Sequence, residues 1–464
     1  MIKNKKNTLI FIAIFAVIGT FFILKDRNKK DSRLINVMIM VIDALRPDHL
    51  GCYGYERNTS PNIDRLAKQG ILFSQAISAG GWTFESVPSI LTSTYSFTHQ
   101  IRGPNNFRNP QIKTIAGELN TKGYHCVLWS NHSTLKYLDI KEGFQKVYIP
   151  YLYKDNNRVL SDYILTSQII NRLKKRYKNI PFFFYIHYEG CHVPYRPPPT
   201  YKHIYLHDNK YGRKSEFIPV SNRSDGDEKY GGQGKIPYVV AENNITDPNY
   251  YISQYDGAIS YTDEQIGRLT DALKELDLDK NTLIILTADH GEMLGEHDIY
   301  FTHNGAYEEN IRVPLIIRFP KLCPRGKVIS RQVSLVDIAP TILELVGLNR
   351  PSYMQGESLF AFIKPFRIYR AKYVLSCCKN TLALRAEDWK LIYANDFHEW
   401  ELFNLRNDPK EQYNLIAKRP DKFKQLKQNL ENRKKYNASL IPVKKGPLLE
   451  EKDKERLRSL GYVQ

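Results

Sequence analysis

Residues 284–292 read IILTADHGE, an apolar run that ends in Asp289 and His290. A second apolar run, within 37–55 (VMIMVIDALRPDHLGCYGY), delivers Asp43 in the same way. Each acid taken alone is typical of a helix cap or turn. Two strand-end acids, one of them beside an imidazole, instead indicate a divalent-cation site at the carboxyl edge of a parallel sheet, where open α/β folds place their ligands.

The remaining pattern predicts an α/β protein with a large, mostly parallel sheet flanked by helices. Strand and helix patterns alternate through most of the 464 residues without a break, which favours one catalytic domain over 34–372. From 373 to 464 the pattern changes to short strands and a terminal basic helix. We predict a small α+β subdomain with antiparallel strands there.

Several elements are specific enough to predict with their boundaries. A polar, Gly/Asn/Lys-rich stretch over 201–249 is expected to be a long surface excursion near a site. The expected helices span 61–70, 112–123 and 263–276, and the expected strands span 125–130, 182–187 and 282–287.

The chain is strongly basic, with 67 Lys and Arg against 49 Asp and Glu and a net charge of +18. Such a balance suits an anionic substrate, an anionic membrane surface or nucleic acid. Much of the excess lies near the two ends, within 1–33 and 418–435, and no zinc-finger or RNA-binding signature accompanies it. We therefore expect no nucleic-acid partner. The six cysteines have neither metal-ligand spacing nor a disulfide framework.

Residues 8–24 (TLIFIAIFAVIGTFFIL) are uncharged and lie between basic flanks. Their length is at the short limit of roughly 17–25 residues for a membrane span. The segment lacks the small-x-small pattern of a cleavage site, which favours an uncleaved anchor in membrane lipid over a cleaved signal peptide. The flanking charges are too similar to set the orientation.

Beyond these local patterns, a series of ordered blocks resembles the sulfatase branch of the alkaline phosphatase superfamily. The blocks are VIDALRPDHLGCYGY (41–55), SVPSILTS (86–93), DGAISYTDEQIGRL (256–269), LTADHGEMLGEH (286–297), YEENIRVPLIIR (307–318), LVDIAPTILELVGL (335–348), DWKLIY (388–393), LFNLRNDPKEQYNL (402–415) and LRSLGYV (457–463). The resemblance implies an alkaline-phosphatase-like fold, an exported catalytic domain and hydrolysis of an anionic ester.

The resemblance also implies one divalent metal ion. Its ligands would be Asp43, Asp289 and His290, with the oxygen of Ser86 approaching the ion. Many sulfatases have a second acid directly after the first, but Ala44 stands here. Calcium is the first choice by resemblance. An imidazole among the ligands also admits manganese or zinc, and oxygen ligands also admit magnesium.

Ser86 matches the position of the family nucleophile, at the start of a helix that suits a bound anion. In sulfatases this residue is oxidised to formylglycine, whose hydrate attacks sulfur. The motif that directs this oxidation ends in an Arg where this chain has Ile90. The alternative is an unmodified hydroxyl that attacks phosphorus, as in phosphotransferring relatives.

Two histidines match catalytic positions of the family. His192 corresponds to the His on the leaving-group side, and His303 to the His or Lys that neutralises the anion. His297, six residues before His303, is a further substrate-binding candidate.

The Lys-x-His pair of relatives aligns loosely with Asn131 and Ser133, which lowers the positive charge of the inferred pocket. Asn131 is nevertheless predicted to bind substrate. Either the substrate is a monoanionic diester, or Arg102, Arg108 or the 201–249 stretch supplies charge from elsewhere. Of these, Arg102 is the predicted substrate-binding residue.

Three functions follow. The first is a membrane-anchored, extracytoplasmic, metal-dependent hydrolase of a sulfate ester on a glycan or small molecule. The second acts on a phosphodiester, a phosphonate ester or a phosphoglycerol headgroup through unmodified Ser86. The third is a non-catalytic surface protein with a degenerate site, which Ala44 and Ile90 would suit.

Overall fold

The computed structural model describes residues 34–104, 106–149, 161–176, 180–206, 217–221, 233–363, 368–369, 373–394 and 398–440. The expected anchor over 8–24 and the terminal LRSLGYV block lie outside these ranges. No helix within them has the length and apolar character needed to cross a bilayer. Residues from Asn36 onward cluster as one compact unit, so the boundary at 372/373 stays a prediction.

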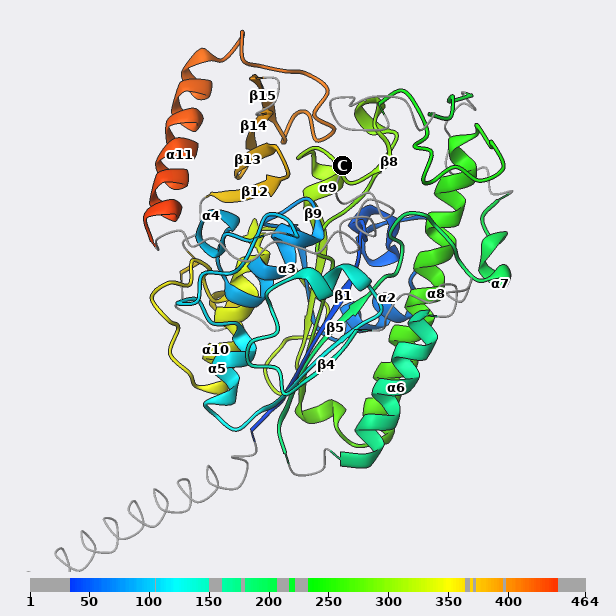
Figure 1. Ribbon diagram of the computed structural model, residues 1–464, viewed down its shortest axis with the longest axis vertical. Helices are drawn as coiled ribbons and strands as arrows, with labels where there is room; N and C mark the ends of the chain where they lie inside the picture. Colours follow the sequence, from blue (N-terminus) through cyan, green and yellow to red (C-terminus); the bar gives the residue numbers. More distant parts are fainter. Residues whose placement is uncertain are drawn as a thin grey trace, which may run out of the picture. The chain divides into compact units, whose positions relative to one another are not determined.

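A nine-stranded sheet runs through the centre of the described chain (Figure 1). Its order is β10-β2-β9-β6-β1-β5-β3-β4, and β11 also pairs with β2. The strands are β1 (Asn36–Ile42), β2 (Ile71–Ile77), β3 (His125–Ser130), β4 (Lys146–Tyr148), β5 (Phe182–Tyr188), β6 (Thr282–Thr287), β9 (Arg312–Arg318), β10 (Lys327–Ile329) and β11 (Val333–Ser334).

The sheet is mostly parallel, as predicted. The central strands β1, β5 and β6 are buried along their whole length, which explains their nearly continuous apolar sequences. Among the described strands of this sheet, β9 alone runs against its neighbours, β6 and β2. The sheet is therefore mixed.

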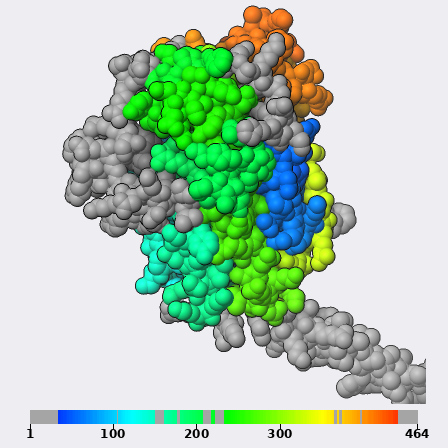
Figure 2. Space-filling view, turned by 90° about the vertical axis from the view of Figure 1, so that its right-hand side faces the viewer, coloured from blue at the N-terminus to red at the C-terminus, as the bar shows by residue number. Residues whose placement is uncertain are grey.

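Helices cover both faces of the sheet. On one side lie α2 (Pro61–Lys68), α6 (Ser161–Arg176) and α8 (Pro248–Glu275), whose surface fills much of the view in Figure 2. The other side carries α3 (Thr83–Thr92), α5 (Ile115–Asn120) and α10 (Ile338–Val346). The remaining short helices are α4 (Ser96–His99), α7 (Pro199–Lys202) and α9 (Glu308–Ile311).

The predicted helices and strands are confirmed, with two corrections at helix ends, whereas much of the 201–249 excursion lies outside the described residues. The helix expected over 263–276 begins at Pro248, because the side chain of Asp247 caps it by accepting from the Asn249 N–H (2.9 Å). The helix expected over 112–123 is shorter. Thr114 caps α5, and Gly123 (φ +78°) closes the turn that follows it.

A four-stranded antiparallel sheet forms the C-terminal part, in the order β12-β13-β14-β15. It comprises β12 (Val374–Cys378), β13 (Thr381–Ala386), β14 (Trp389–Ala394) and β15 (Glu399–Asn404), and the basic helix α11 (Pro420–Ser439) packs against β14. A small ribbon of β7 (Met293–Leu294) and β8 (Tyr300–Thr302) follows the central strand β6.

Candidate active site and metal centre

The site is built at the carboxyl edge of four adjacent strands. Strands β6, β1, β5 and β3 lie side by side and run parallel, so their ends meet at one edge. Asp43 follows β1 and Asp289 follows β6, while His187 lies near the end of β5 and His132 lies two residues beyond β3. This arrangement brings residues from distant parts of the chain together.

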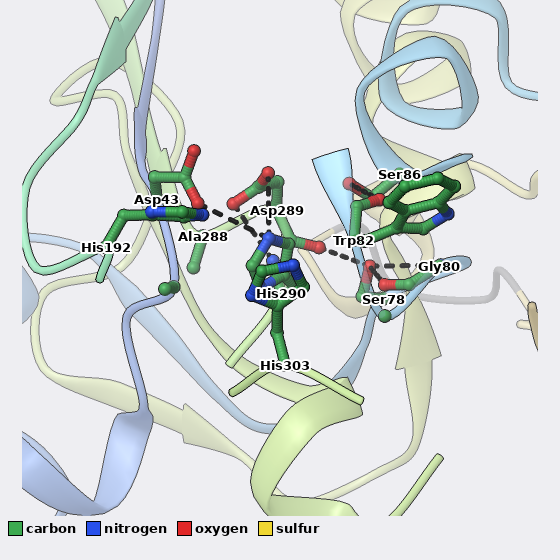
Figure 3. A network of polar contacts seen from close by, with 12 residues as sticks. Asp43, Ser78, Gly80, Trp82, Ser86, His192, Ala288, Asp289, His290 and His303 are labelled. Carbon is green, nitrogen blue, oxygen red and sulfur yellow. Dashed lines mark hydrogen bonds and ion pairs between the residues drawn. The ribbon is translucent and has the colours of Figure 1, made fainter. Parts of the chain in front are cut away.

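The three predicted metal ligands turn toward one another (Figure 3). His290 Nε2 lies 3.3 Å from Asp43 Oδ1 and 3.6 Å from Asp289 Oδ2. The other ring nitrogen, Nδ1, donates to the carbonyl of Gly291 at 2.8 Å, which leaves Nε2 as the ligating atom.

These side chains are fully buried, and the three converging atoms have no hydrogen-bond partner among the described residues. Buried polar atoms are normally satisfied. A divalent cation at this position would satisfy all three, so Asp43, Asp289 and His290 fit the expected metal.

The pKa values of Asp43 and Asp289 shift in opposite directions. Burial alone would raise the pKa of Asp43, but His132, His192 and His187 hold that pKa well below its usual value. Burial and the charge of Asp43 together raise the pKa of Asp289. Asp43 is thus the stable anion of the pair.

Two further histidines contact Asp43, on its other oxygen. His132 Nδ1 lies 2.8 Å and His187 Nε2 lies 3.0 Å from Asp43 Oδ2. The alignment of the family's Lys-x-His pair with Asn131 and Ser133 does not include His132, the residue between them. The signal available in the sequence was a histidine at the end of each of two parallel strands.

Ser86 lies in the first turn of α3 and is fully buried. Its hydroxyl donates to the carbonyl of Trp82 at 3.1 Å. The loop before the helix packs closely on this turn, since a Cβ on Gly80 would lie 2.8 Å from the Ser86 nitrogen. Ser78 in the same loop donates to the carbonyl of Asp289, which links the nucleophile helix to the metal centre (Figure 3).

The two predicted catalytic histidines lie beside the metal group, which we define as Asp43, Asp289 and His290. The rings of His192 and His303 lie 5.2 Å apart, and His303 lies 4.8 Å from the ring of His290. His192 Nδ1 donates to the carbonyl of Val193 at 2.7 Å. Burial lowers the pKa of His303 well below its usual value, and His290 and His192 lower it further, so its imidazole is neutral at physiological pH.

The three predicted substrate-binding residues do not join this group. Asn131 donates to Ser161 Oγ (2.8 Å) and to Asp162 Oδ1 (2.5 Å), and its own oxygen accepts from the Glu189 N–H (2.7 Å). It therefore ties the end of β3 to the start of α6. A role for Asn131 in substrate binding therefore stays a prediction.

His297 and Arg102 are not among the three metal ligands. The His297 ring stacks on Tyr307 at 3.7 Å and lines a cavity of about 800 Å³ that none of the metal-group residues lines. Its backbone is left-handed (φ 55°). The guanidinium of Arg102 lies 4.1 Å from the centre of the Phe97 ring and is exposed.

Lys379, just after β12, is a cation near the site that the sequence reasoning missed. Its backbone N–H donates to Glu85 Oε2 (3.2 Å), and its ammonium lies 5.1 Å from the centre of the Trp82 ring. Its charge also contributes to the low pKa of His303. Lys379 thus brings positive charge to the side of the site where Ser86 lies.

The nucleophile loop and β12 form a short parallel contact. Gly80 bridges to Cys377, the Gly81 N–H donates to the Cys377 carbonyl (3.0 Å), and the Cys377 N–H donates to the Ala79 carbonyl (2.9 Å). The C-terminal sheet therefore supports the start of α3 directly.

Comparison with known proteins agrees with this geometry. The chain is 26% identical to the N-acetylglucosamine-6-O-sulfatase of Bacteroides thetaiotaomicron, over 93% of this chain and 92% of that protein. It is likewise 26% identical to an arylsulfatase of Clostridium perfringens, over 82% of this chain and 90% of that protein.

Two solved structures have the same fold. One is a protein in complex with its substrate D-glucosamine-2-N,6-O-disulfate (TM-score 0.71, 24% identity, covering 88% of this chain and 99% of the other). The second is the phosphonate monoester hydrolase of Agrobacterium radiobacter (TM-score 0.71, 19% identity, 89% and 100%).

The family models extend over most of the chain. Residues 295–437 match the C-terminal model of N-sulphoglucosamine sulphohydrolase. Residues 35–348 match the sulfatase model, and the chain belongs to the sulfatase family.

Proposed function

We propose that the protein hydrolyses a sulfate ester on an amino sugar of a glycan, with Ser86 as the nucleophile position. The observation that carries this proposal is the convergence of Asp43, Asp289 and His290 beside the Ser86 helix. Support for an amino sugar comes from the Bacteroides N-acetylglucosamine-6-O-sulfatase, which aligns along nearly its whole length, and from the glucosamine disulfate bound to a structure of the same fold.

We assign the following catalytic roles to residues of the chain. An oxygen on residue 86 attacks the sulfur, and the sulfur–oxygen bond to the sugar breaks. His192 donates a proton to the departing sugar oxygen, a role worth roughly a hundredfold to ten-thousandfold in rate. The neutral His303 donates a hydrogen bond to a sulfate oxygen. The ammonium group of Lys379 offsets the negative charge of the sulfate. Asp43, Asp289 and His290 would hold a divalent metal ion, which would polarise the ester and favour the ionised nucleophile.

The covalent state of residue 86 separates this function from a second candidate. Oxidation of Ser86 to formylglycine would supply the hydrate that attacks sulfur, and regeneration of the aldehyde would release sulfate. Ile90 stands in place of the arginine that normally follows, and its side chain is fully buried. That observation favours the second candidate, in which the unmodified Ser86 hydroxyl attacks a phosphonate ester or phosphodiester.

We also propose that residues 8–24 anchor the protein in a membrane with the catalytic domain outside the cytoplasm. The apolar run between basic flanks supports this proposal. The substrate would then be an extracytoplasmic glycan.

The decisive experiment joins mass spectrometry of the Ser86 peptide to assays of N-acetylglucosamine 6-sulfate, an aryl sulfate and a bis-aryl phosphate. We expect sulfate release that Ser86→Ala abolishes, whereas Ser89→Ala, in the same helix, retains it. If formylglycine is required, Ser86→Thr will be as inactive as Ser86→Ala, because oxidised threonine is a ketone. Cleavage of the diester alone, with unmodified serine, would establish the second candidate instead.

A further inference from the structure

Three tyrosines from three helices line a cleft that the proposed catalytic steps do not use. Tyr163 lies in α6, Tyr201 in α7 and Tyr261 in α8, and we call the space that they line the tyrosine cleft. Both α6 and α7 pack against α8 (Figure 1). The cleft has a volume of about 570 Å³, within the roughly 300–1,000 Å³ of small-ligand sites.

Contacts within the protein hold the three rings in place. The Tyr201 hydroxyl donates to the Glu264 carboxylate, and the Tyr261 hydroxyl accepts from the Tyr163 N–H at 3.2 Å. The guanidinium of Arg268 lies 4.2 Å from the centre of the Tyr163 ring. A surface that is ordered before binding loses little conformational entropy when a ligand arrives.

Gly257 allows α7 to approach α8 closely beside the cleft. A Cβ at this position would lie 2.5 Å from the carbonyl oxygen of Tyr201, which is shorter than a normal contact. Tyr261 follows Gly257 by four residues, so both lie on the same face of α8. The sequence of α8 therefore provides both the close contact with α7 and one wall of the cleft.

The chemistry of the cleft suits a sugar ring. The apolar face of a sugar packs on aromatic side chains, while its hydroxyl groups need polar partners at the edge. The exposed side chains of Thr200 and Glu264 provide such an edge beside the three rings. A purely apolar ligand would remove these polar groups from water without replacing their hydrogen bonds.

A small hollow connects the tyrosine cleft with the catalytic residues. The residues that line the hollow include Tyr261, which also lines the cleft, and His192, on the leaving-group side of the active site. Its volume of about 30 Å³ corresponds to roughly one water molecule, so a glycan would pass over it. The exposed Arg196 also lines the hollow and could pair with a carboxylate or sulfate on that part of the glycan.

We propose that the tyrosine cleft binds a second sugar residue of the glycan whose sulfate ester is cleaved at Ser86. The glycan extends from the leaving-group side at His192, past Arg196, to the three rings. The substrate is then an oligosaccharide or a polymer, and a free monosaccharide uses only part of the site. This inference rests on the proposed function for the identity of the ester, whereas the binding of the glycan can be measured separately.

Four variants test the role of the rings. Tyr163→Ala and Tyr201→Ala each remove one ring from the cleft. Tyr201→Phe keeps the ring and loses only the hydroxyl group that donates to Glu264. Tyr413→Ala is the matched control, because Tyr413 is 68% exposed and is not among the residues that line the cleft.

The first measurement compares kcat/KM for N-acetylglucosamine 6-sulfate with kcat/KM for a tetrasaccharide of alternating N-acetylglucosamine 6-sulfate and glucuronate. We expect the wild type, Tyr201→Phe and Tyr413→Ala to prefer the tetrasaccharide. Tyr163→Ala and Tyr201→Ala should lose about tenfold of this preference, mainly through KM. A wild type without the preference, or the same preference in all four variants, would overturn the proposal.

The second measurement separates this proposal from the proposed function. The same tetrasaccharide is titrated calorimetrically into Ser86→Ala, alone and combined with each of the four variants, so that binding is measured without turnover. Weaker binding with Tyr163→Ala and Tyr201→Ala, but not with Tyr413→Ala, would support the cleft even if the wild type releases no sulfate. Equal binding in all of them, or no binding to Ser86→Ala that circular dichroism shows to be folded, would overturn the proposal.

Discussion

The backbone N–H of Lys379 donates a hydrogen bond to the carboxyl group of Glu85 at 3.2 Å. Glu85 directly precedes Ser86 in α3, so this bond fastens the C-terminal sheet to the helix that carries the nucleophile. The left-handed backbone of Lys379 (φ 52°) turns the chain here at the end of β12. The side chain of Lys379 therefore lies near the site although it is almost 300 residues from Ser86 in the sequence.

Replacing Lys379 with Ala should weaken substrate binding. A charge-assisted contact contributes about 1.5–3 kcal/mol, and partial exposure reduces this, so we expect KM to rise about tenfold. Steady-state kinetics at low and high salt provide the measurement, and the difference between variant and wild type should shrink as salt increases. Lys280→Ala is the control, because it removes an exposed ammonium that pairs with Asp277. An unchanged KM in Lys379→Ala would exclude Lys379 from the binding site.

Asp289→Ala should remove metal and activity together. Asp289 supplies one of the three converging atoms of the metal site, together with Asp43 and His290. Turnover should therefore fall by about a thousandfold or more as metal content falls. Metal analysis and kinetics on the same preparation test this. Asp271→Ala, which removes an exposed partner of Arg65, should change neither. Full activity with the metal retained in Asp289→Ala would rule out this centre.

Asp162 should make stability depend on pH. Burial raises its pKa to about 6 from an ordinary value of 3.8, and nearby Glu189 adds to the shift. A carboxyl group whose pKa is raised by folding stabilises the protein fully below pH 3.8, and this contribution is lost as the pH rises through 6. The loss amounts to at most about 3 kcal/mol.

Denaturant unfolding at pH 4 and pH 7 can measure this effect. Between these pH values the wild type should lose up to about 3 kcal/mol more unfolding free energy than Asp162→Asn. The asparagine can still accept from Asn131, so the variant should fold. Parallel pH profiles for the two proteins would show that Asp162 does not titrate in this range.

Deleting residues 1–33 should release the protein from the membrane without loss of activity. The deletion removes the apolar run and its basic flanks, and none of the groups at the carboxyl edge of the sheet. Fractionation and activity assays on the deletion variant provide the measurement. Continued membrane association would mean that another part of the chain also binds lipid.

The sequence was most informative where parallel strands end. Asp43 and Asp289 could be predicted to meet because the carboxyl ends of neighbouring parallel strands share one edge. Asn131 and His132 both lie beyond the end of β3, where side chains no longer alternate between the two faces of the sheet. The sequence therefore could not show which of the two side chains points toward Asp43. The left-handed backbone at His297 is another feature that residue type does not reveal.

Lys379 was beyond prediction for a different reason. Its position near Trp82 depends on the pairing of Gly80 with Cys377, a contact between distant segments that no local pattern encodes. Long-range pairings of this kind are specified by the packing of the whole chain.

The pairing of Gly80 with Cys377 also sets an order of events during synthesis. The ribosome makes Cys377 only after nearly 300 further residues, about 15–60 seconds later at the usual 5–20 residues per second. Until then the loop before Ser86 lacks its partner strand, and in the finished fold Ser86 is completely covered. An enzyme that needs this segment in an extended form therefore has to act before Cys377 pairs with Gly80.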